Sequence, residues 1–430
     1  MSPVVVMFVA FAVCLALGIP IAWSIGIPVA IYLGMTGMFQ PTYIANTLYT
    51  ACDTFPLMAI PLFVLAGTLM EGGGLSKRLI DFADSICGHI TGGLAVITVI
   101  TCMFFGALSG SAAATVVAIG SIMVPYMRKM GYSKGFSYAL ITASGCLGVL
   151  IPPSIPLVLY GIATNASIGN LFLGGFGSGF AVGGALIIVA LIICHKRGYK
   201  GNGMKFSFRR VLITFKNALG ALMVPIIILG GIYGGIFTPT EAAGVACIYG
   251  LFAGIFLYKE LTFKKIVDGL INSVSTNAQI LVIVGTATCL ARMMTVENIP
   301  RLISETVQNA TDSKFVVLLL INVVLLIAGC VMDASPVITI LAPILYPIVA
   351  AYGVDPIHFG VMFITNTTIG YITPPVGLNI FVAVGMGDCS LRELIRPLAP
   401  FFIAMVAALM LITYCPDVVL FIPRLCGYGG

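Results

Sequence analysis

The chain has 430 residues, of which 60% are hydrophobic and 8% are charged, whereas ordinary soluble domains carry about 25% charged residues. So few charges could not cover the surface of a water-soluble protein of this size, and the composition therefore excludes a soluble enzyme. The net charge of +6 comes from basic residues gathered in short loops, as the positive-inside rule describes, and does not indicate a nucleic-acid partner.

Apolar runs long enough to cross a membrane recur along the whole chain. They predict an all-α polytopic membrane protein with about 11 transmembrane helices. Several runs are too long for one crossing and are interrupted by Gly or Pro. No Lys or Arg precedes the first run, so we expect a retained first span rather than a signal peptide. The runs cover 4–38, 55–70, 94–126, 136–165, 175–194, 217–235, 242–258, 277–293, 315–348, 358–386 and 398–421.

Charge in the loops predicts their sidedness. The most basic stretch, 195–216, is expected in the cytoplasm, and a second basic loop at 259–265 is expected to return there. The turn between them, 237–241, has no basic residue and is expected outside.

An internal repeat divides the chain. When the sequence is shifted by 222 residues, Phe104–Tyr126 falls on Leu326–Ile348, and Pro152–Pro153 falls on Pro374–Pro375 without a gap. The loop after the first segment carries Arg128, Lys129 and Lys134, whereas its partner at 350–355 has an acid and no Lys or Arg. Equivalent loops are therefore predicted on opposite faces, which is the inverted repeat of many secondary transporters.

The repeat predicts a division into five parts. Residues 1–60 would form N-terminal helices, and 191–275 a basic cytoplasmic linker with further helices. The first inverted repeat at 61–190 would contain a re-entrant hairpin at 94–126 and a broken helix at 136–165. The second repeat at 276–395 would contain the equivalent hairpin at 315–348 and broken helix at 358–386, and 396–430 would form the C-terminal helix.

Four breaks interrupt the apolar runs at matched positions of the repeat. Gly106–Ala112 and Ala328–Pro336 fit the tips of re-entrant hairpins, and Gly148–Ser154 and Gly370–Val376 contain double prolines that force the backbone out of a helix. Broken backbone at membrane depth is tolerated where it lines a wet cavity. Freed carbonyls suit a monovalent cation and half-helix N-termini suit a carboxylate, although simple kinks remain an alternative.

Charged residues in apolar surroundings are costly and therefore informative. Asp333, at the second tip, is the best acidic candidate. Glu241 either caps a helix or has a function, and Arg292 either meets an anion or extends to the membrane interface. The Cys and His residues show no metal-ligand spacing, and the sequence contains no nucleophile–base pair and no nucleotide-binding motif, so we expect neither an enzyme nor a bound cofactor.

The sequence resembles a known family at these residues. The segments are FFGALSGSAAATVVAIGSIMVP, GVLIPPSIPLVLYGIATNASIGNLFLGG, GGIYGGIFTPTEAAG, DASPVITILAPILYPI and GYITPPVGLNIFVAVG. They are similar to the large membrane subunit of tripartite ATP-independent periplasmic (TRAP) transporters, and the resemblance covers about 4–421.

The resemblance implies a scaffold, to which the helices of 1–60 and 191–275 would belong, and a mobile transport domain, the two working as an elevator. It also implies two Na⁺ sites, where each hairpin tip meets the broken helix of its own half. The first site would comprise Gly106, Ser109, Gly148, Ile151 and Pro153. The repeat register projects the second site onto Val331, Asp333, Gly370, Thr373 and Pro375. Substrate is expected between the tips, near Ser111, Ser154, Asn366 and, less directly, Arg292.

The resemblance also implies the function and the partners. We expect Na⁺-coupled import of a small organic acid, such as a C4-dicarboxylate or sialic acid, across the bacterial inner membrane, with Na⁺ as the coupling ion. A separate small four-helix membrane subunit and a periplasmic substrate-binding protein would complete the system. A Na⁺/carboxylate symporter without a binding protein, and a channel lined by the same carbonyls, remain alternatives.

Overall fold

The computed structural model describes residues 2–37, 40–201, 203, 206–387 and 389–429. All regular structure in these ranges is helical. Residues 202, 204 and 205 of the basic stretch 195–216 lie outside the described residues.

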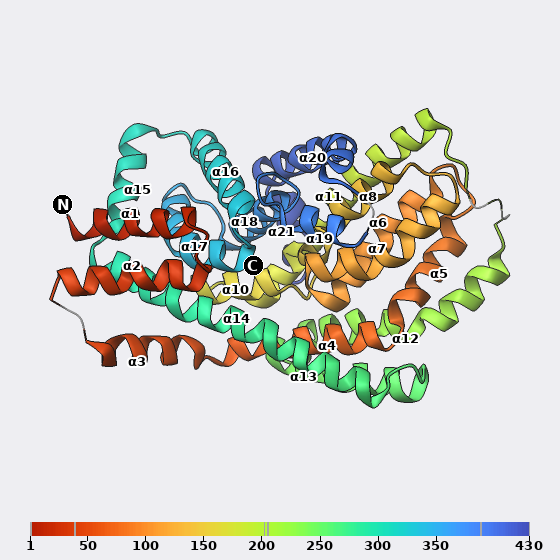
Figure 1. The fold of residues 1–430 in the computed structure, drawn as a ribbon, viewed down its shortest axis with the longest axis horizontal. Helices are drawn as coiled ribbons and strands as arrows, with labels where there is room; N and C mark the ends of the chain where they lie inside the picture. Colours follow the sequence, from red (N-terminus) through yellow and green to blue (C-terminus); the bar gives the residue numbers. More distant parts are fainter. Residues whose placement is uncertain (1, 38–39, 202, 204–205, 388, 430) are drawn as a thin grey trace.

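The helices follow one another through short turns (Figure 1). In chain order they are α1 (Pro3–Ala16), α2 (Ile21–Met35), α3 (Pro41–Cys52), the 3₁₀ turn η1 (Phe55–Met58), α4 (Ala59–Gly72), α5 (Leu75–Cys87), α6 (Gly93–Ser109), α7 (Ala112–Lys129), α8 (Lys134–Ser144), α9 (Leu147–Leu150), α10 (Ile155–Thr164), α11 (Ile168–Arg197), α12 (Phe208–Tyr233), α13 (Pro239–Phe252), the π-helical turn η2 (Ala253–Leu257), α14 (Phe263–Val296), α15 (Ile299–Ala310), α16 (Lys314–Val331), α17 (Ala334–Ala351), α18 (Pro356–Gly370), α19 (Leu378–Gly385), α20 (Leu391–Tyr414) and α21 (Asp417–Leu425).

Eight helices among the described residues are long and apolar enough to cross a membrane, or nine if α8–α9 and α10, bent by 43°, count as one broken span. The sequence predicted about 11 crossings. Three predicted runs, 4–38, 94–126 and 358–386, each divide into two helices, none of which meets this criterion, whereas the run 315–348 divides into two helices, α16 and α17, that both do.

Helix boundaries follow the 222-residue register. Shifting α7 by 222 residues gives the bounds of α17, and shifting α6 gives those of α16 to within one residue. The peptide bonds Pro152–Pro153 and Pro374–Pro375 are both cis. The register therefore describes a structural repeat as well as a sequence repeat.

The two halves interlock through their broken helices. The second part of the first broken helix, α10, packs against α17 of the other half, and its equivalent α19 packs against α7. Cys146 and Thr368, which are equivalent in the register, meet where the halves join, with Cys146 Sγ 3.4 Å from Thr368 O. This reciprocal packing holds the two hairpin tips on either side of a common space.

Four helices form one edge of the molecule. Figure 1 shows α3, α4, α13 and α14 along its lower side, and α4 packs against both α13 and α14. The α1–α2 pair turns at Gly18, whose φ is +71°. It forms a second, smaller core with the end of α14 and with Ile340 and Ile344 of α17.

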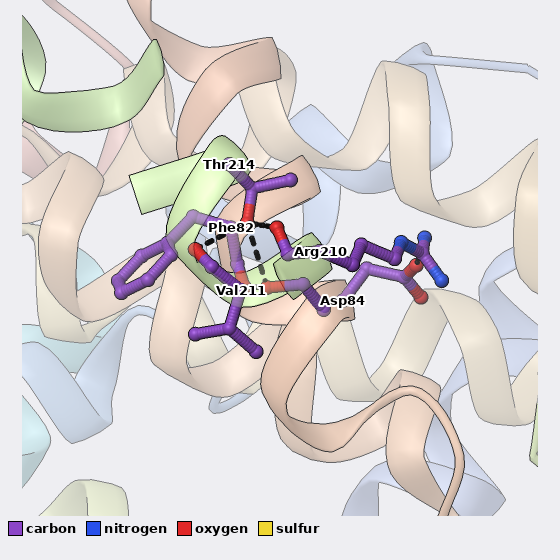
Figure 2. A network of polar contacts seen from close by, with 6 residues as sticks. Phe82, Asp84, Arg210, Val211 and Thr214 are labelled. Carbon is purple, nitrogen blue, oxygen red and sulfur yellow. Dashed lines mark hydrogen bonds and ion pairs between the residues drawn. The ribbon is translucent and has the colours of Figure 1, made fainter. Parts of the chain in front are cut away.

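A polar network joins α5 to α12 at the other end of the molecule (Figure 2). Arg210 Nη2 lies 2.6 Å from Asp84 Oδ2, and Thr214 Oγ1 lies 2.8 Å from Ser85 Oγ. Ser85 in turn donates to Phe82 O at 2.6 Å. Because α5 leads directly into α6, this network anchors the base of the first hairpin to α12.

Candidate substrate and cation site

Both hairpin tips face one cavity of about 780 Å³. The first tip contributes Gly110–Ala113, the second Val331–Asp333 with Ser335 and Pro336, and the second break Tyr371 and Val376. The opposite wall comes from the α1–α2 turn and from α14. The structure thus brings together two hairpins that are more than 200 residues apart in the sequence.

The cavity wall is largely apolar with a few polar groups. The apolar side chains include Leu15, Ile19, Ile21, Ile280 and Ile283. The polar side chains are those of Ser111, Thr276, Gln279, Asp333, Ser335 and Tyr371. Among the described residues that line the cavity, Asp333 is the single charged one, so a bound anion meets a negative and not a positive side chain.

The first tip is closed by a left-handed glycine and a serine cap. Helix α6 ends at Ser109, Gly110 has φ +61°, and Ser111 begins α7 by accepting a hydrogen bond from Ala114 N at 3.4 Å. The first two residues of α7, Ala112 and Ala113, also line the cavity. A helix N-terminus of this kind favours a negatively charged ligand.

The first tip packs closely against the first break. A Cβ at Gly106 would lie 2.8 Å from Leu147 O, and a Cβ at Gly110 would lie 2.8 Å from Pro153 O. A Cβ at Gly148 would lie 2.5 Å from Ser111 O and would overlap the hydroxyl of Thr115. The glycines are therefore required by close approach of backbone to backbone.

The predicted members of the first cation site gather at this contact. Gly106, Gly148 and Pro153 form it directly, and Ser109 Oγ lies 3.2 Å from Thr115 Oγ1, which itself touches Gly148. Ile151 lies on the same break, buried, with its amide donating to Leu147 O at 3.1 Å.

The second tip packs against the second break in a different way. A Cβ at Gly370 would overlap the carbonyl group of Gly329, Val376 N donates to Cys330 O at 3.2 Å, and Ala334 N donates to Tyr371 Oη at 3.0 Å. The tip itself is held by the backbone and by the Tyr371 hydroxyl.

Some predicted members of the second cation site lie at the cavity, and the others lie in the second break. Val331 and Asp333 are exposed to the cavity, where Ser335 Oγ donates to Asp333 Oδ2 at 3.3 Å. Thr373 donates to Ile369 O at 2.8 Å. Gly370 is buried, and Pro375 is exposed in the cis pair.

Three of the four predicted substrate residues do not line the cavity, whereas Ser111 does. Ser154 is fully buried, donates to Val149 O at 2.5 Å and caps α10 through Leu157 N. Asn366 is also fully buried and donates to Asn322 O at 2.9 Å. Arg292 is exposed and donates to Thr47 Oγ1 at 3.2 Å. Their roles in substrate binding stay predictions.

Three residues at the site were missed by sequence reasoning: Thr115, Gln279 and Tyr371. Gln279 is exposed to the cavity from α14, inside the predicted apolar span 277–293, where a carboxamide is unusual. Thr115 could have been found from the register, because it aligns with Val337 and is thus a polar residue in one half only.

The donor set suits a monovalent cation better than a transition metal. The described residues contain no group of three or more His, Cys, Asp and Glu side chains placed to hold a metal ion. The first tip offers carbonyl and hydroxyl oxygens, and the second adds one carboxylate. Oxygen ligands of this kind coordinate Na⁺ at broken helices of secondary transporters.

Glu241 belongs to a helix cap. Its carboxylate accepts from Thr238 N at 2.8 Å and from Thr238 Oγ1 at 2.9 Å, while Thr238 Oγ1 accepts from Glu241 N at 3.3 Å. This reciprocal capping box favours the structural interpretation of the motif over a functional one.

A solved structure with a similar fold is that of the YdaH transporter of Alcanivorax borkumensis. The TM-score is 0.63 at 17% identity, and the match covers 86% of this chain and 88% of the other. At this identity the likeness concerns the fold alone.

Curated relatives are considerably closer in sequence. The isethionate TRAP transporter permease protein DctMQ of Oleidesulfovibrio alaskensis is 44% identical over 98% of this chain, and the chain spans 66% of that protein's length. The C4-dicarboxylate TRAP transporter large permease protein DctM of Rhodobacter capsulatus is 39% identical over 99% of this chain and 100% of its own length. The sialic acid TRAP transporter large permease protein SiaM of Vibrio cholerae is 37% identical over 96% of both chains.

The family model of the tripartite ATP-independent periplasmic transporter DctM component matches residues 8–418, nearly the whole chain. Its members named above are transporter permeases and not enzymes, in agreement with the expectation from the sequence. On this match and on these relatives, the chain belongs to the DctM component family of tripartite ATP-independent periplasmic transporters.

Proposed function

We propose that this chain is the large permease subunit of a transporter that imports a small organic acid together with Na⁺. The proposal rests mainly on one observation: both hairpin tips face one cavity. Among the described residues that line it, Asp333 is the single charged one. The three relatives described above are named for isethionate, C4-dicarboxylates and sialic acid, all of which are small acids.

The negative charge of Asp333 supplies a physical reason for coupling. Two unit charges 4 Å apart repel by about 4 kcal/mol at an effective dielectric constant of about 20. A substrate carboxylate in the cavity therefore binds weakly unless a cation neutralises Asp333 first. Na⁺ bound between the second tip and its break would remove this repulsion, so that substrate and ion occupy the cavity together.

The first tip supplies the complementary half of the site. Its helix N-terminus lines the cavity and has no carboxylate, so the acidic group of the substrate would face Ser111 and the start of α7. Gln279 on α14 would then contact the polar part of the substrate furthest from the acid.

The division into a moving and a fixed part extends the proposal. Each tip is locked to the break of its own half, and the halves interlock through α10–α17 and α7–α19. A unit of this kind would move as one body with the ion and substrate. Helices α3, α4, α13 and α14 would form the scaffold along which it travels, as an elevator in the bacterial inner membrane.

The partners follow from the family. The relative whose name joins M and Q is longer than this chain, which spans 66% of it. We propose that a small membrane subunit acts together with this chain, and that a periplasmic binding protein delivers the substrate.

Reconstituted uptake tests the proposal. The chain, its small subunit and the binding protein are placed in liposomes, and uptake of radiolabelled dicarboxylates and sialic acid is measured with an inward Na⁺ gradient. Uptake is expected only with the gradient and the binding protein. Full uptake without the binding protein would favour a simple symporter, and large passive flux without Na⁺ would favour a channel.

Asp333→Ala gives a sharper test of the ion site. The variant should lose most of the Na⁺ dependence of uptake while it still assembles with the small subunit, as judged by co-purification. Unchanged Na⁺ activation in this variant would remove Asp333 from the site.

A further inference from the structure

Thr115 lies at the centre of the contact between the first tip and the first break. It is fully buried in the first turns of α7. Its Oγ1 lies 2.7 Å from Ser111 O and 3.2 Å from Ser109 Oγ, and it packs against Gly148 so closely that a Cβ there would overlap it. Among the described residues, Thr115 provides the one side-chain oxygen that contacts Ser109.

Proton accounting assigns the direction of these hydrogen bonds. A threonine hydroxyl has one proton, and the shorter contact of Thr115, 2.7 Å, is to Ser111 O, which can only accept. Thr115 must therefore accept at its 3.2 Å contact with Ser109, and Ser109 is the donor there.

Two consequences follow for oxygen atoms at the tip. Ser111 O accepts from Thr115 Oγ1 at 2.7 Å and from Thr115 N at 3.2 Å, so both of its lone pairs are occupied. Its 3.4 Å contact with Ser109 Oγ is therefore weaker than the 3.2 Å contact of Ser109 with Thr115. The proton of Ser109 points to Thr115, and one Ser109 lone pair receives only a 3.5 Å contact from Ser111 N. The other lone pair of Ser109 receives no hydrogen bond among the described residues, so it is available to coordinate a cation.

The second half of the repeat has none of this arrangement. The equivalents of Ser109, Ser111 and Thr115 are Val331, Asp333 and Val337. Three hydroxyls in the first half are thus replaced by one carboxylate and two hydrocarbon side chains. The two tips therefore offer different ligands to a cation. The first tip offers oriented neutral oxygen atoms, and the second offers a negatively charged carboxylate.

We propose that Thr115 is the positioning residue of the first cation site, which turns the hydroxyl oxygen of Ser109 towards Na⁺ without binding the ion itself. This inference rests on the proposed Na⁺ coupling and adds to it. With Thr115 replaced by Val, the nearest acceptor for Ser109 is Ser111 O at 3.4 Å. The hydroxyl then rotates, and its lone pairs leave the ion position.

The test measures Na⁺ binding directly. The purified subunit is titrated with NaCl at constant ionic strength with choline chloride, and the rise in melting temperature gives an apparent Kd. Thr115→Val should weaken Na⁺ binding about five- to tenfold, the effect of losing one oriented hydrogen bond. Thr115→Ser keeps the hydroxyl and should restore the apparent Kd to within about twofold.

A matched control separates positioning from packing. Thr98 is also fully buried, on the neighbouring arm α6, and its hydroxyl donates to Leu94 O at 2.8 Å. In the absence of Na⁺, Thr98→Val should lower the melting temperature by about as much as Thr115→Val does. The Kd for Na⁺ should be unchanged in Thr98→Val. If the Val variant of Thr115 does not fold, Thr115→Ala makes the same test with a smaller side chain.

The outcomes distinguish the inference from the proposed function. A wild-type chain whose melting temperature does not respond to Na⁺ overturns Na⁺ coupling and this inference with it. A wild-type response that persists unchanged in Thr115→Val and Thr115→Ala overturns the role of Thr115 alone. Equal loss of Na⁺ affinity in Thr115→Ser and Thr115→Val also overturns it, because the serine retains the hydroxyl.

Discussion

Gly148→Ala is the sharpest perturbation of the proposed cation site. A Cβ at this position would lie 2.5 Å from Ser111 O, whereas ordinary contacts begin at 3.4 Å, a shortfall of 0.9 Å. Ser111 O is backbone, so it cannot swing away as a long side chain would. The first tip must therefore move away from the break by about 1 Å, at a typical cost of about 1–3 kcal/mol for overpacking.

The displacement should appear in ion binding more than in folding. Since the tip and the break together supply the oxygen ligands, we expect the apparent Kd for Na⁺ to rise at least about tenfold, which corresponds to about 1.4 kcal/mol. The assay is the Na⁺ titration of the melting temperature, followed by Na⁺ activation of uptake in liposomes.

Gly184→Ala is the matched control. Gly184 lies in α11, and a Cβ there would meet nothing within 4 Å. The control should keep wild-type Na⁺ binding and gain up to about 1 kcal/mol of stability from the better helix former. Wild-type Na⁺ affinity in Gly148→Ala would refute the assignment of this contact as an ion site.

Three further predictions concern the cavity wall and the α5 anchor. Gln279→Leu should raise the KM for substrate with an unchanged Kd for Na⁺, because Gln279 lines the cavity on α14 away from both tip–break contacts; a parallel change of both constants in uptake and titration assays would contradict this. Asp84→Asn should lower stability by about 1–3 kcal/mol because it removes the negative charge that lies 2.6 Å from the Arg210 guanidinium, whereas Arg301→Ala breaks an exposed pair and should leave the thermal unfolding midpoint essentially unchanged. Partial burial raises the pKa of the Asp81 carboxyl, whereas the nearby Lys77, Arg210 and Arg78 lower it, so the protonated form is slightly favoured in the folded protein and stability falls as pH rises through the folded pKa. Because the Asp81 side chain is exposed to solvent, Asp81→Asn should raise the melting temperature at pH 7 only slightly, and the gain should disappear as the pH is lowered towards 4.

Local patterns in the sequence already determined the helices and their interruptions. Apolar runs predict helices, and Gly110 and the double prolines mark where helices must stop, because these effects depend on neighbouring residues alone. The register of 222 residues located the two tips and the two breaks, and the helix bounds in the structure follow it.

Tertiary packing decided which side chains reach the cavity. Ser111 and Ser154 have the same local role, since each caps the helix that follows a break. Yet Ser111 lines the cavity, whereas Ser154 is fully buried against Val149 O. Asn366 donates to Asn322, and Arg292 to Thr47, each through contacts between distant segments.

The same distinction explains why the sequence did not reveal the positions of Thr115 and Gln279. A sequence shows that each is polar, but the rotation of α7 and α14 about their axes is set by the helices packed around them. That rotation places Thr115 against Gly148 and turns Gln279 into the cavity. The sequence therefore determined where the backbone breaks, through local steric and hydrogen-bonding effects, and only the tertiary structure decided which oxygen atoms converge, because convergence depends on contacts between the two halves and the scaffold.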